Sequence, residues 1–317
     1  MTLQRSVVND LLRGIVLTLS LFFAGVTVPV LGLAVGGFAP LPIAYYFRKI
    51  GMRYGLLLLL TVATIVGFTA GIRVGAFFLA EFAAMGVALS ESVRMKLPLG
   101  KGVLLAAAAS IAGSALFMLS ISSSLDKPLP QVIGDQVREN LQVTVEAYKK
   151  VGLPDEQVEG LTEFTGRVEA IILKVFPSLF FIGTLSVAIL NILALKGLLK
   201  KNGVEEYQIE PANWRSPEPL VWLLIAGGAL LLIKNEWAWV IGLNLLVVSG
   251  GIYLFQGMAI MAFYFKKLQT PLFFKALGYL LIVFQQIFTI MVIGFGLFDL
   301  WFDFRRLKTE KPSKKEA

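Results

Sequence analysis

Long apolar runs recur along the whole chain, and they constrain its fold more than any other feature. The runs are about 16 to 30 residues long, and a run of about 18 or more is typical of a membrane span. We predict spans over residues 14–33, 34–47, 54–71, 74–92, 102–124, 169–195, 219–233, 237–265, 272–286 and 287–304. A soluble domain with a very large core would not need such runs repeated so often. The pattern therefore predicts an all-α integral membrane protein.

The amino-acid composition agrees with this class. The chain is 56% hydrophobic and 16% charged, whereas a soluble domain carries about 45–50% apolar and about 25% charged residues. The net charge is +8, but the basic residues lie in short loops between apolar runs, which is the pattern of cytoplasmic membrane loops. We expect a lipid bilayer as the partner and no nucleic acid.

The absence of cysteine and histidine excludes several kinds of chemistry. Disulfides, thiol nucleophiles, thiolate or imidazole metal sites and imidazole-based triads are all ruled out. Gly100-Lys101 does not belong to a phosphate-binding loop, because the position five residues before Gly100 is Met95 and not glycine. We expect no enzymatic activity, no metal and no cofactor.

Charge placement predicts the topology. Regions 14–47 and 272–304 are too long for one span and short for two, because a 16-residue helix reaches only about 24 Å across a core of about 30 Å. If both are helical hairpins, six basic clusters face the cytoplasm and hold 21 of the 29 basic residues. This predicts eight to ten spans with both termini in the cytoplasm. The N-terminus is expected to be a retained span, since Asp10 and Arg13 lie beside it and no A-x-A site follows.

Helix breakers support the hairpins. Pro29 and the stretch 36–42 interrupt the first region, Pro177 should kink the span beginning near 169, and Gln285-Gln286 mark a break in the last region. Glycines also recur every four residues in GFTAGIRVG, at Gly67, Gly71 and Gly75. We interpret them as a close helix packing site that includes a turn.

Residues 125–168 differ from the apolar runs. They carry eight acidic and five basic residues, opposite in sign to the cytoplasmic loops. One face of an amphipathic helix is formed by Ile133, Val137, Leu141, Val145 and Tyr148. A second helix should start after Gly152-Leu153, with Pro154 in its first turn. The segment is either a helical hairpin on the outer bilayer surface or a lid or partner-docking element. We therefore divide the chain into N-terminal spans (1–124), an extracytoplasmic helical segment (125–168), C-terminal spans (169–304) and a basic cytoplasmic tail (305–317).

Polar residues inside the spans are the best candidates for a ligand site, because a charge at the centre of a span costs about 2.5–3.5 kcal/mol. Glu81 is the clearest one, since Arg73 is two helical turns away and too far to pair with it. Asn191, Asn244 and Gln256 are weaker candidates, together with Gln285 and Gln286, because hydrogen bonds between helices would also explain them.

The stretch GLFDLWFDFRR, residues 296–306, places charges among aromatic residues. Asp299 and Asp303 are one helical turn apart, and Arg306 follows Asp303 by three residues, so pairs along the helix are available. We interpret Asp299, Trp301, Asp303, Arg305 and Arg306 as a collar where the helix leaves the membrane.

Several stretches together resemble one family, the YybS-like bacterial membrane proteins, which form a domain of unknown function. The resemblance rests on VGLPDEQVEGL (151–161), Asn191 with the LLKKNG end, NWRSPEP (213–219), Asn244 in GLNLL, YLFQGMAI (253–260) and GLFDLWFDFRR. It covers most of the chain and implies a multi-pass protein of the bacterial cytoplasmic membrane, without an established reaction.

A weaker likeness, at the level of fold only, is to the substrate-capturing subunits of energy-coupling-factor vitamin transporters. It rests on the N-terminal hairpin, the RKIGMRYG loop and paired short spans. Two hypotheses follow. The protein is a small-solute binding or transport module with Glu81 and the span amides as polar contacts, or it is a non-catalytic scaffold or assembly protein that docks a partner membrane protein.

Overall fold

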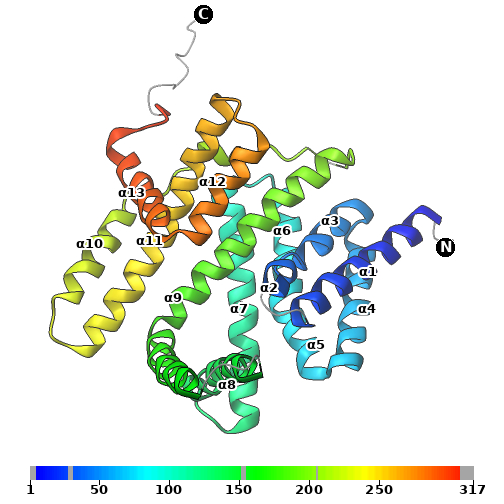
Figure 1. Cartoon of the computed structure of the whole chain (residues 1–317). Coiled ribbons are helices and arrows are strands. Elements are labelled where there is room, and N and C mark those ends of the chain that lie inside the picture. The colour runs from blue at the N-terminus through cyan, green and yellow to red at the C-terminus, as the bar shows by residue number, and fades with distance from the viewer. Residues whose placement is uncertain (1–4, 28–30, 151–154, 205, 308–317) are drawn as a thin grey trace, which may run out of the picture. The chain divides into compact units, whose positions relative to one another are not determined.

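The computed structural model describes residues 5–27, 31–150, 155–204 and 206–307, and within them the chain is helical, with no strand (Figure 1). The elements are α1 Arg5–Thr27, α2 Leu31–Gly36, α3 Pro40–Ile50, α4 Met52–Ala70, α5 Ile72–Phe78, the π-helix η1 Leu79–Ala83, α6 Ala84–Arg94, α7 Leu99–Leu125, α8 Leu129–Lys150, α9 Asp155–Lys201, the 3₁₀-helix η2 Pro211–Asn213, α10 Leu220–Leu231, α11 Glu236–Lys267, α12 Leu272–Phe284 and α13 Gln286–Phe302. The all-α architecture predicted from the apolar runs is confirmed.

Six helical segments in the described part of the chain are long and apolar enough to cross a membrane. The count becomes seven if α12 and α13, which meet at a bend of 103°, form one span. The eight to ten spans expected from the sequence also included 34–47, 219–233 and each half of 272–304. These regions are folded as shorter helices, which explains the difference between the two counts.

The chain divides into two compact units. Unit 1 comprises Met1–Phe176 and Gly183–Gln208, and unit 2 comprises Pro177–Ile182 and Ile209–Ala317. The division passes through α9, which remains helical across Pro177. A proline inside a helix has no backbone N–H to donate, and its ring clashes with the carbonyl four residues earlier. One boundary between the units coincides with Pro177.

Glycines allow two tight hairpins in unit 1. A Cβ on Gly25 of α1 would lie 2.7 Å from the Cα of Gly36, so α1 and α2 approach backbone to backbone. The predicted packing glycines form the second hairpin: Gly71 turns the chain with φ +101°, and a Cβ on Gly75 would lie 3.0 Å from the Cα of Gly67. The breaker Pro29 lies outside the described residues.

The segment after α7 forms the predicted amphipathic helix. Val145 of α8 is buried, while Ile133, Val137 and Leu141 are partly buried on the same face. Arg138 holds α8 to the next helix through a 2.8 Å salt bridge to Glu169. The predicted break at Gly152-Leu153 and the opening residue Pro154 lie outside the described residues, and α9 then runs without interruption from Asp155.

The loop after α9 is anchored within unit 1 by Tyr207. Its side chain is buried, and its hydroxyl donates a 2.5 Å hydrogen bond to the carbonyl of Leu97. Burial raises the pKa of Tyr207 to about 12, so the hydroxyl keeps the proton that it donates. The contact joins the turn before α7 to the loop after α9.

Glycines also set the core of unit 2. A Cβ on Gly257 of α11 would lie 2.1 Å from the carbonyl oxygen of Val292, and one on Gly296 of α13 would lie 2.0 Å from that of Tyr253. These two helices therefore cross at backbone contact, the geometry that small residues permit between membrane helices. The predicted break at Gln285-Gln286 is confirmed, because α12 ends at Phe284 and α13 begins at Gln286.

The helix crossing generates a first prediction. Replacing Gly296 by alanine should lower the free energy of unfolding by about 1–3 kcal/mol, because the new methyl group overlaps the Tyr253 carbonyl and the helices must separate. The matched control is Gly294→Ala on the same helix, where a Cβ has no heavy atom within 4 Å. Unfolding in mixed micelles measures both; equal stability of the two variants would contradict the close crossing.

Candidate functional site

The four residues predicted to contact a ligand belong to different units. Glu81 and Asn191 lie in unit 1, whereas Asn244 and Gln256 lie in unit 2. Among the residues that the structure describes, each one is hydrogen-bonded to a different protein group. They are described in turn below.

Glu81 lies on the π-helix η1, in the middle of the span Ile72–Arg94. The π-helix inserts an extra residue into the turn, as shown by the amide of Ala84 bonding back to the carbonyl of Leu79. The side chain of Glu81 is partly buried and accepts a hydrogen bond from the hydroxyl of Ser114 on α7. The partner that the sequence required for Glu81 is thus a serine of a neighbouring span.

Two features of α7 shape the surroundings of Glu81: a glycine that allows close packing and a second buried serine. A Cβ on Gly113 would lie 2.0 Å from the carbonyl oxygen of Ala80, so α7 contacts the backbone of the π-helix directly. Ser110 lies one turn before Ser114 on the same helix face, and its hydroxyl is fully buried without a hydrogen-bond partner among the described residues. π-Helices occur frequently at functional sites, and this one places a carboxylate and two hydroxyls on adjoining helices.

Asn191 is fully buried on α9 and connects it to the N-terminal hairpin. Its amide donates to the carbonyl of Gly37 at 2.7 Å and to that of Val187, one turn earlier, at 2.8 Å. The Gly37 carbonyl lies in the turn between α2 and α3, where the helical hydrogen bonds stop. Asn191 therefore replaces a missing backbone partner, as an interhelical amide in a membrane protein commonly does.

Asn244 of α11 has a comparable position in unit 2. Its Oδ1 accepts a 3.2 Å hydrogen bond from the amide of Ser178, the residue after Pro177, and its Nδ2 donates to the carbonyl of Val240 at 2.8 Å. Proline disturbs the helical ladder around it. The asparagine thus bonds to the backbone of α9 beside that disturbance.

Gln256 belongs to a buried polar network that we call the Asp299 cluster. The network joins the loop before α10, the middle of α11 and the end of α13, and it comprises Arg215, Ser216, Gln256, Asp299, Asp303 and Arg305. Gln256 accepts from the amide and the hydroxyl of Ser216 and donates to the Oδ2 of Asp299 at 3.1 Å. A residue predicted as a ligand contact is therefore joined to residues predicted as a collar.

An ion pair without solvent exposure forms the centre of the Asp299 cluster. The Nη2 of Arg305 lies 2.8 Å from the Oδ2 of Asp299, and both side chains are 0% exposed. Arg305 also donates from its Nη1 to the carbonyls of Ala212 and Trp214, at 2.6 and 2.9 Å. The Oδ1 of Asp299 accepts from the amide of Phe304 at 2.9 Å. These bonds offset much of the large cost of removing two charges from water, although the buried Nε of Arg305 has no hydrogen-bond partner among the described residues.

The pairing differs from the helical pairs expected from the sequence. α13 ends at Phe302, and Asp303 adopts a left-handed conformation with φ 42°. The chain therefore turns back, so that Arg305 reaches Asp299 six residues earlier, while Asp303 pairs with Arg215 at 3.0 Å. Arg306 is exposed, and so is Trp301. The pairing of Arg215 with Asp299 could not be predicted from spacing along one helix, because the two residues are 84 positions apart.

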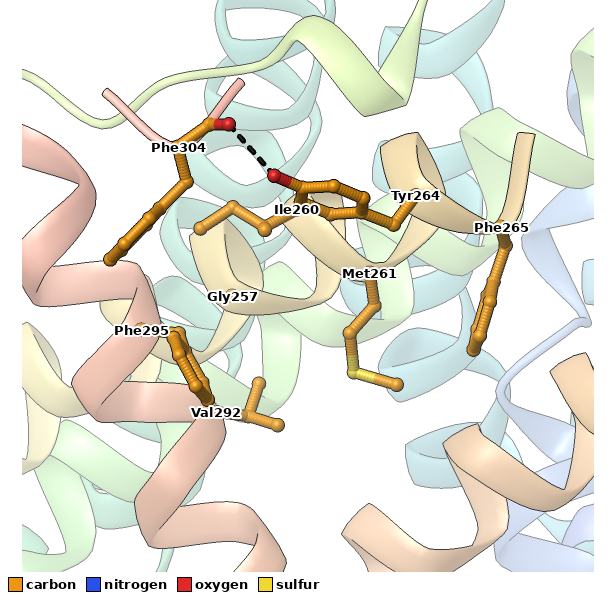
Figure 2. A pocket seen from close by; sticks show the side chains of 8 residues that line it. All are labelled: Gly257, Ile260, Met261, Tyr264, Phe265, Val292, Phe295 and Phe304. Atoms are coloured by element: carbon orange, nitrogen blue, oxygen red, sulfur yellow. Dashed lines mark hydrogen bonds between the residues drawn. The ribbon is translucent and has the colours of Figure 1, made fainter. Parts of the chain in front are cut away.

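Two cavities lie along α11 in unit 2. The first, of about 390 Å³, is apolar, and Figure 2 shows its wall formed by residues of α11 and α13 with Phe304: Gly257, Ile260, Met261, Tyr264, Phe265, Val292, Phe295 and Phe304. The second, of about 530 Å³, lies at the turn into α12 and is lined by Ala262, Phe265, Lys266, Gln269, Thr270, Lys275 and Tyr279. Glu81, Asn191, Asn244 and Gln256 line neither of these two cavities.

Comparison with known proteins gives the family. Residues 16–300 match the pattern of the family described as predicted membrane protein, DUF2232. The chain belongs to the DUF2232 family. This agrees with the YybS-like resemblance carried by the sequence, and together with the apolar helices it makes the DUF2232 protein a multi-pass membrane protein. No curated protein and no solved structure matches the chain.

The Asp299 cluster generates a second prediction. Asp299→Asn should lower the free energy of unfolding by about 3–5 kcal/mol, because the substitution leaves the buried Arg305 without a counter-charge. Asp303→Asn removes a more exposed pair with Arg215 and should cost about 1 kcal/mol or less. Chemical denaturation of the DUF2232 protein in micelles compares the two variants. Equal losses would mean that the Asp299–Arg305 pair is not the centre of this network.

Proposed function

We propose that the protein is a non-catalytic small-solute binding module of the bacterial cytoplasmic membrane, with both termini in the cytoplasm. The observation that carries this proposal is the environment of Glu81, a carboxylate on a π-helix inside an apolar span. Ionisable residues within membrane spans are expensive, and they commonly mark solute or ion pathways.

The chemistry around Glu81 favours a small solute that is positively charged or rich in hydrogen-bond donors. Glu81 is acceptor-only when it is ionised, and Ser114 satisfies one of its oxygens. The hydroxyl of Ser110 contributes a second polar group one turn away, and it has no partner within the described residues. A cationic solute would neutralise the carboxylate and replace the water that ionised carboxylates otherwise need.

A second candidate function, a scaffold or assembly protein, is supported by different residues. The amides of Asn191, Asn244 and Gln256 are bonded to protein groups, which is typical of packing inside a helical bundle. Val143 on α8 and Phe164 on α9 are large apolar side chains exposed in the segment expected to lie outside the bilayer. Exposed apolar side chains of this kind can dock a partner protein.

The solute proposal predicts the effect of one substitution. The wild-type protein, purified in native nanodiscs, should carry a small molecule that is detected by mass spectrometry of the released contents. Glu81→Gln should reduce its amount at least about tenfold, since losing the contact to one charged group typically costs more than about 1.4 kcal/mol. The matched control is Glu91→Gln, which removes a carboxylate of α6 paired with Arg94 at its end.

The result separates the two functions. Equal small-molecule content in the wild type, Glu81→Gln and Glu91→Gln would overturn the solute proposal. Photo-crosslinkers placed at Val143 and Phe164 test the scaffold function in native membranes. A single protein crosslinked at both positions would support it, and crosslinks to lipid alone would contradict it.

A further inference from the structure

The two cavities along α11 differ in chemistry and adjoin each other. Phe265 lines both of them, so it stands at their boundary. The first is bounded by aliphatic and aromatic side chains, and its tyrosine hydroxyl is engaged, because Tyr264 donates to the carbonyl of Phe304 at 2.9 Å (Figure 2). The second is bounded by two lysines, a glutamine, a threonine and a tyrosine. We call the first cavity the apolar groove and the second the basic pocket.

The positive charge of the basic pocket is only weakly compensated. Lys266 approaches Glu210 at 3.4 Å, and the two side chains are 74% and 57% exposed, so solvent and salt screen this pair strongly. Lys275, which is partly buried, has no ion-pair partner among the residues that the structure describes. No carboxylate lines the pocket. An anion placed between Lys266 and Lys275 would therefore be attracted by both ammonium groups.

The surface around the basic pocket is strongly apolar. Leu268, Leu272 and Phe273, at the turn between α11 and α12, are all at least 70% exposed. Such side chains beside lysines are typical of the depth at which lipid headgroups meet the hydrocarbon core of a membrane. A ligand at this position would therefore contact both the polar headgroup region and the acyl chains.

The ring of Phe265, which borders both cavities, packs against α12. A Cβ on Gly278 would lie 2.9 Å from the Cζ of Phe265 and 3.4 Å from the Cε of Met261. Phe265 also makes an edge-to-face contact with Tyr279, with ring centroids 5.8 Å apart. Because Gly278 has no side chain, α12 can approach Phe265 and Met261 closely, and no residue of α12 lines the apolar groove.

We propose that this composite cavity binds one anionic phospholipid. Its phosphate lies between Lys266 and Lys275, and an acyl chain lies in the groove beside Met261 and Phe295. A phosphate diester supplies the anion, and basic pockets between membrane helices are suited to such headgroups. The adjoining groove distinguishes a lipid from free phosphate, because inorganic phosphate has no apolar part to bury. The site is separate from Glu81 and does not depend on the proposed solute.

Native mass spectrometry of the full chain tests the site with two defined probes. The protein, delipidated in detergent, is mixed with phosphatidylglycerol or with phosphatidylcholine carrying the same acyl chains. We expect one retained phosphatidylglycerol per chain, and at least tenfold less retained phosphatidylcholine. The double substitution Lys266→Gln with Lys275→Gln should abolish this preference, while Lys267→Gln, which alters an exposed lysine outside the cavity, should leave it unchanged.

Two further arms address the groove and the source of the phosphate. Met261→Trp fills the apolar groove and should lower retention of phosphatidylglycerol at least tenfold, with the thermal midpoint of the variant confirming that it is folded. Inorganic phosphate at ten times the lipid concentration should not displace the lipid. The proposal is overturned if phosphate competes, if Lys267→Gln weakens retention as much as the double substitution does, or if folded Met261→Trp retains the lipid fully.

Discussion

The absence of water in a bilayer core is the constraint on which this structure depends, because every backbone polar group placed there needs a partner from the protein. The asparagines meet this need for the backbone: Asn191 bonds to the turn at Gly37, and Asn244 bonds to the amide after Pro177. The hydroxyl of Ser114 likewise donates a hydrogen bond to the carboxylate of Glu81. The polar asparagines in the spans thus hydrogen-bond to backbone groups at the places where helices are interrupted or disturbed.

The Asp299 cluster extends this arrangement to full charges. The ion pair of Asp299 and Arg305 is isolated from solvent, and its remaining hydrogen-bonding capacity is largely taken by Gln256 and by backbone groups of the loop before α10. The cluster requires close approach of α11 and α13, which Gly257 and Gly296 permit. Removing one charge would leave the other buried alone, which is strongly destabilising.

The two proposed binding sites carry charges of opposite sign in apolar surroundings. Glu81 is one acid in an apolar span, held by a hydroxyl and located on a π-helix, so it favours a solute that brings positive charge or donors. The cavity at Lys266 and Lys275 lies where exposed apolar side chains surround basic groups, so it favours a lipid that brings negative charge and a hydrocarbon chain. In each site, the charge of the protein groups is opposite to the charge of the expected ligand.

The sequence by itself determined the membrane class, the all-α fold, the breaks at Gln285 and Gly71 and the amphipathic helix α8, because these depend on local composition and periodicity. The family resemblance rested on specific motifs, and the family match over residues 16–300 agrees with it. Only the tertiary structure decided which polar groups meet. Arg305 pairs with Asp299 because Asp303 turns the chain back, and Arg215 joins them from 84 residues away. Spacing along a helix predicts neighbours within one or two turns, whereas these contacts depend on how distant helices pack, and on glycines whose partners lie on another helix.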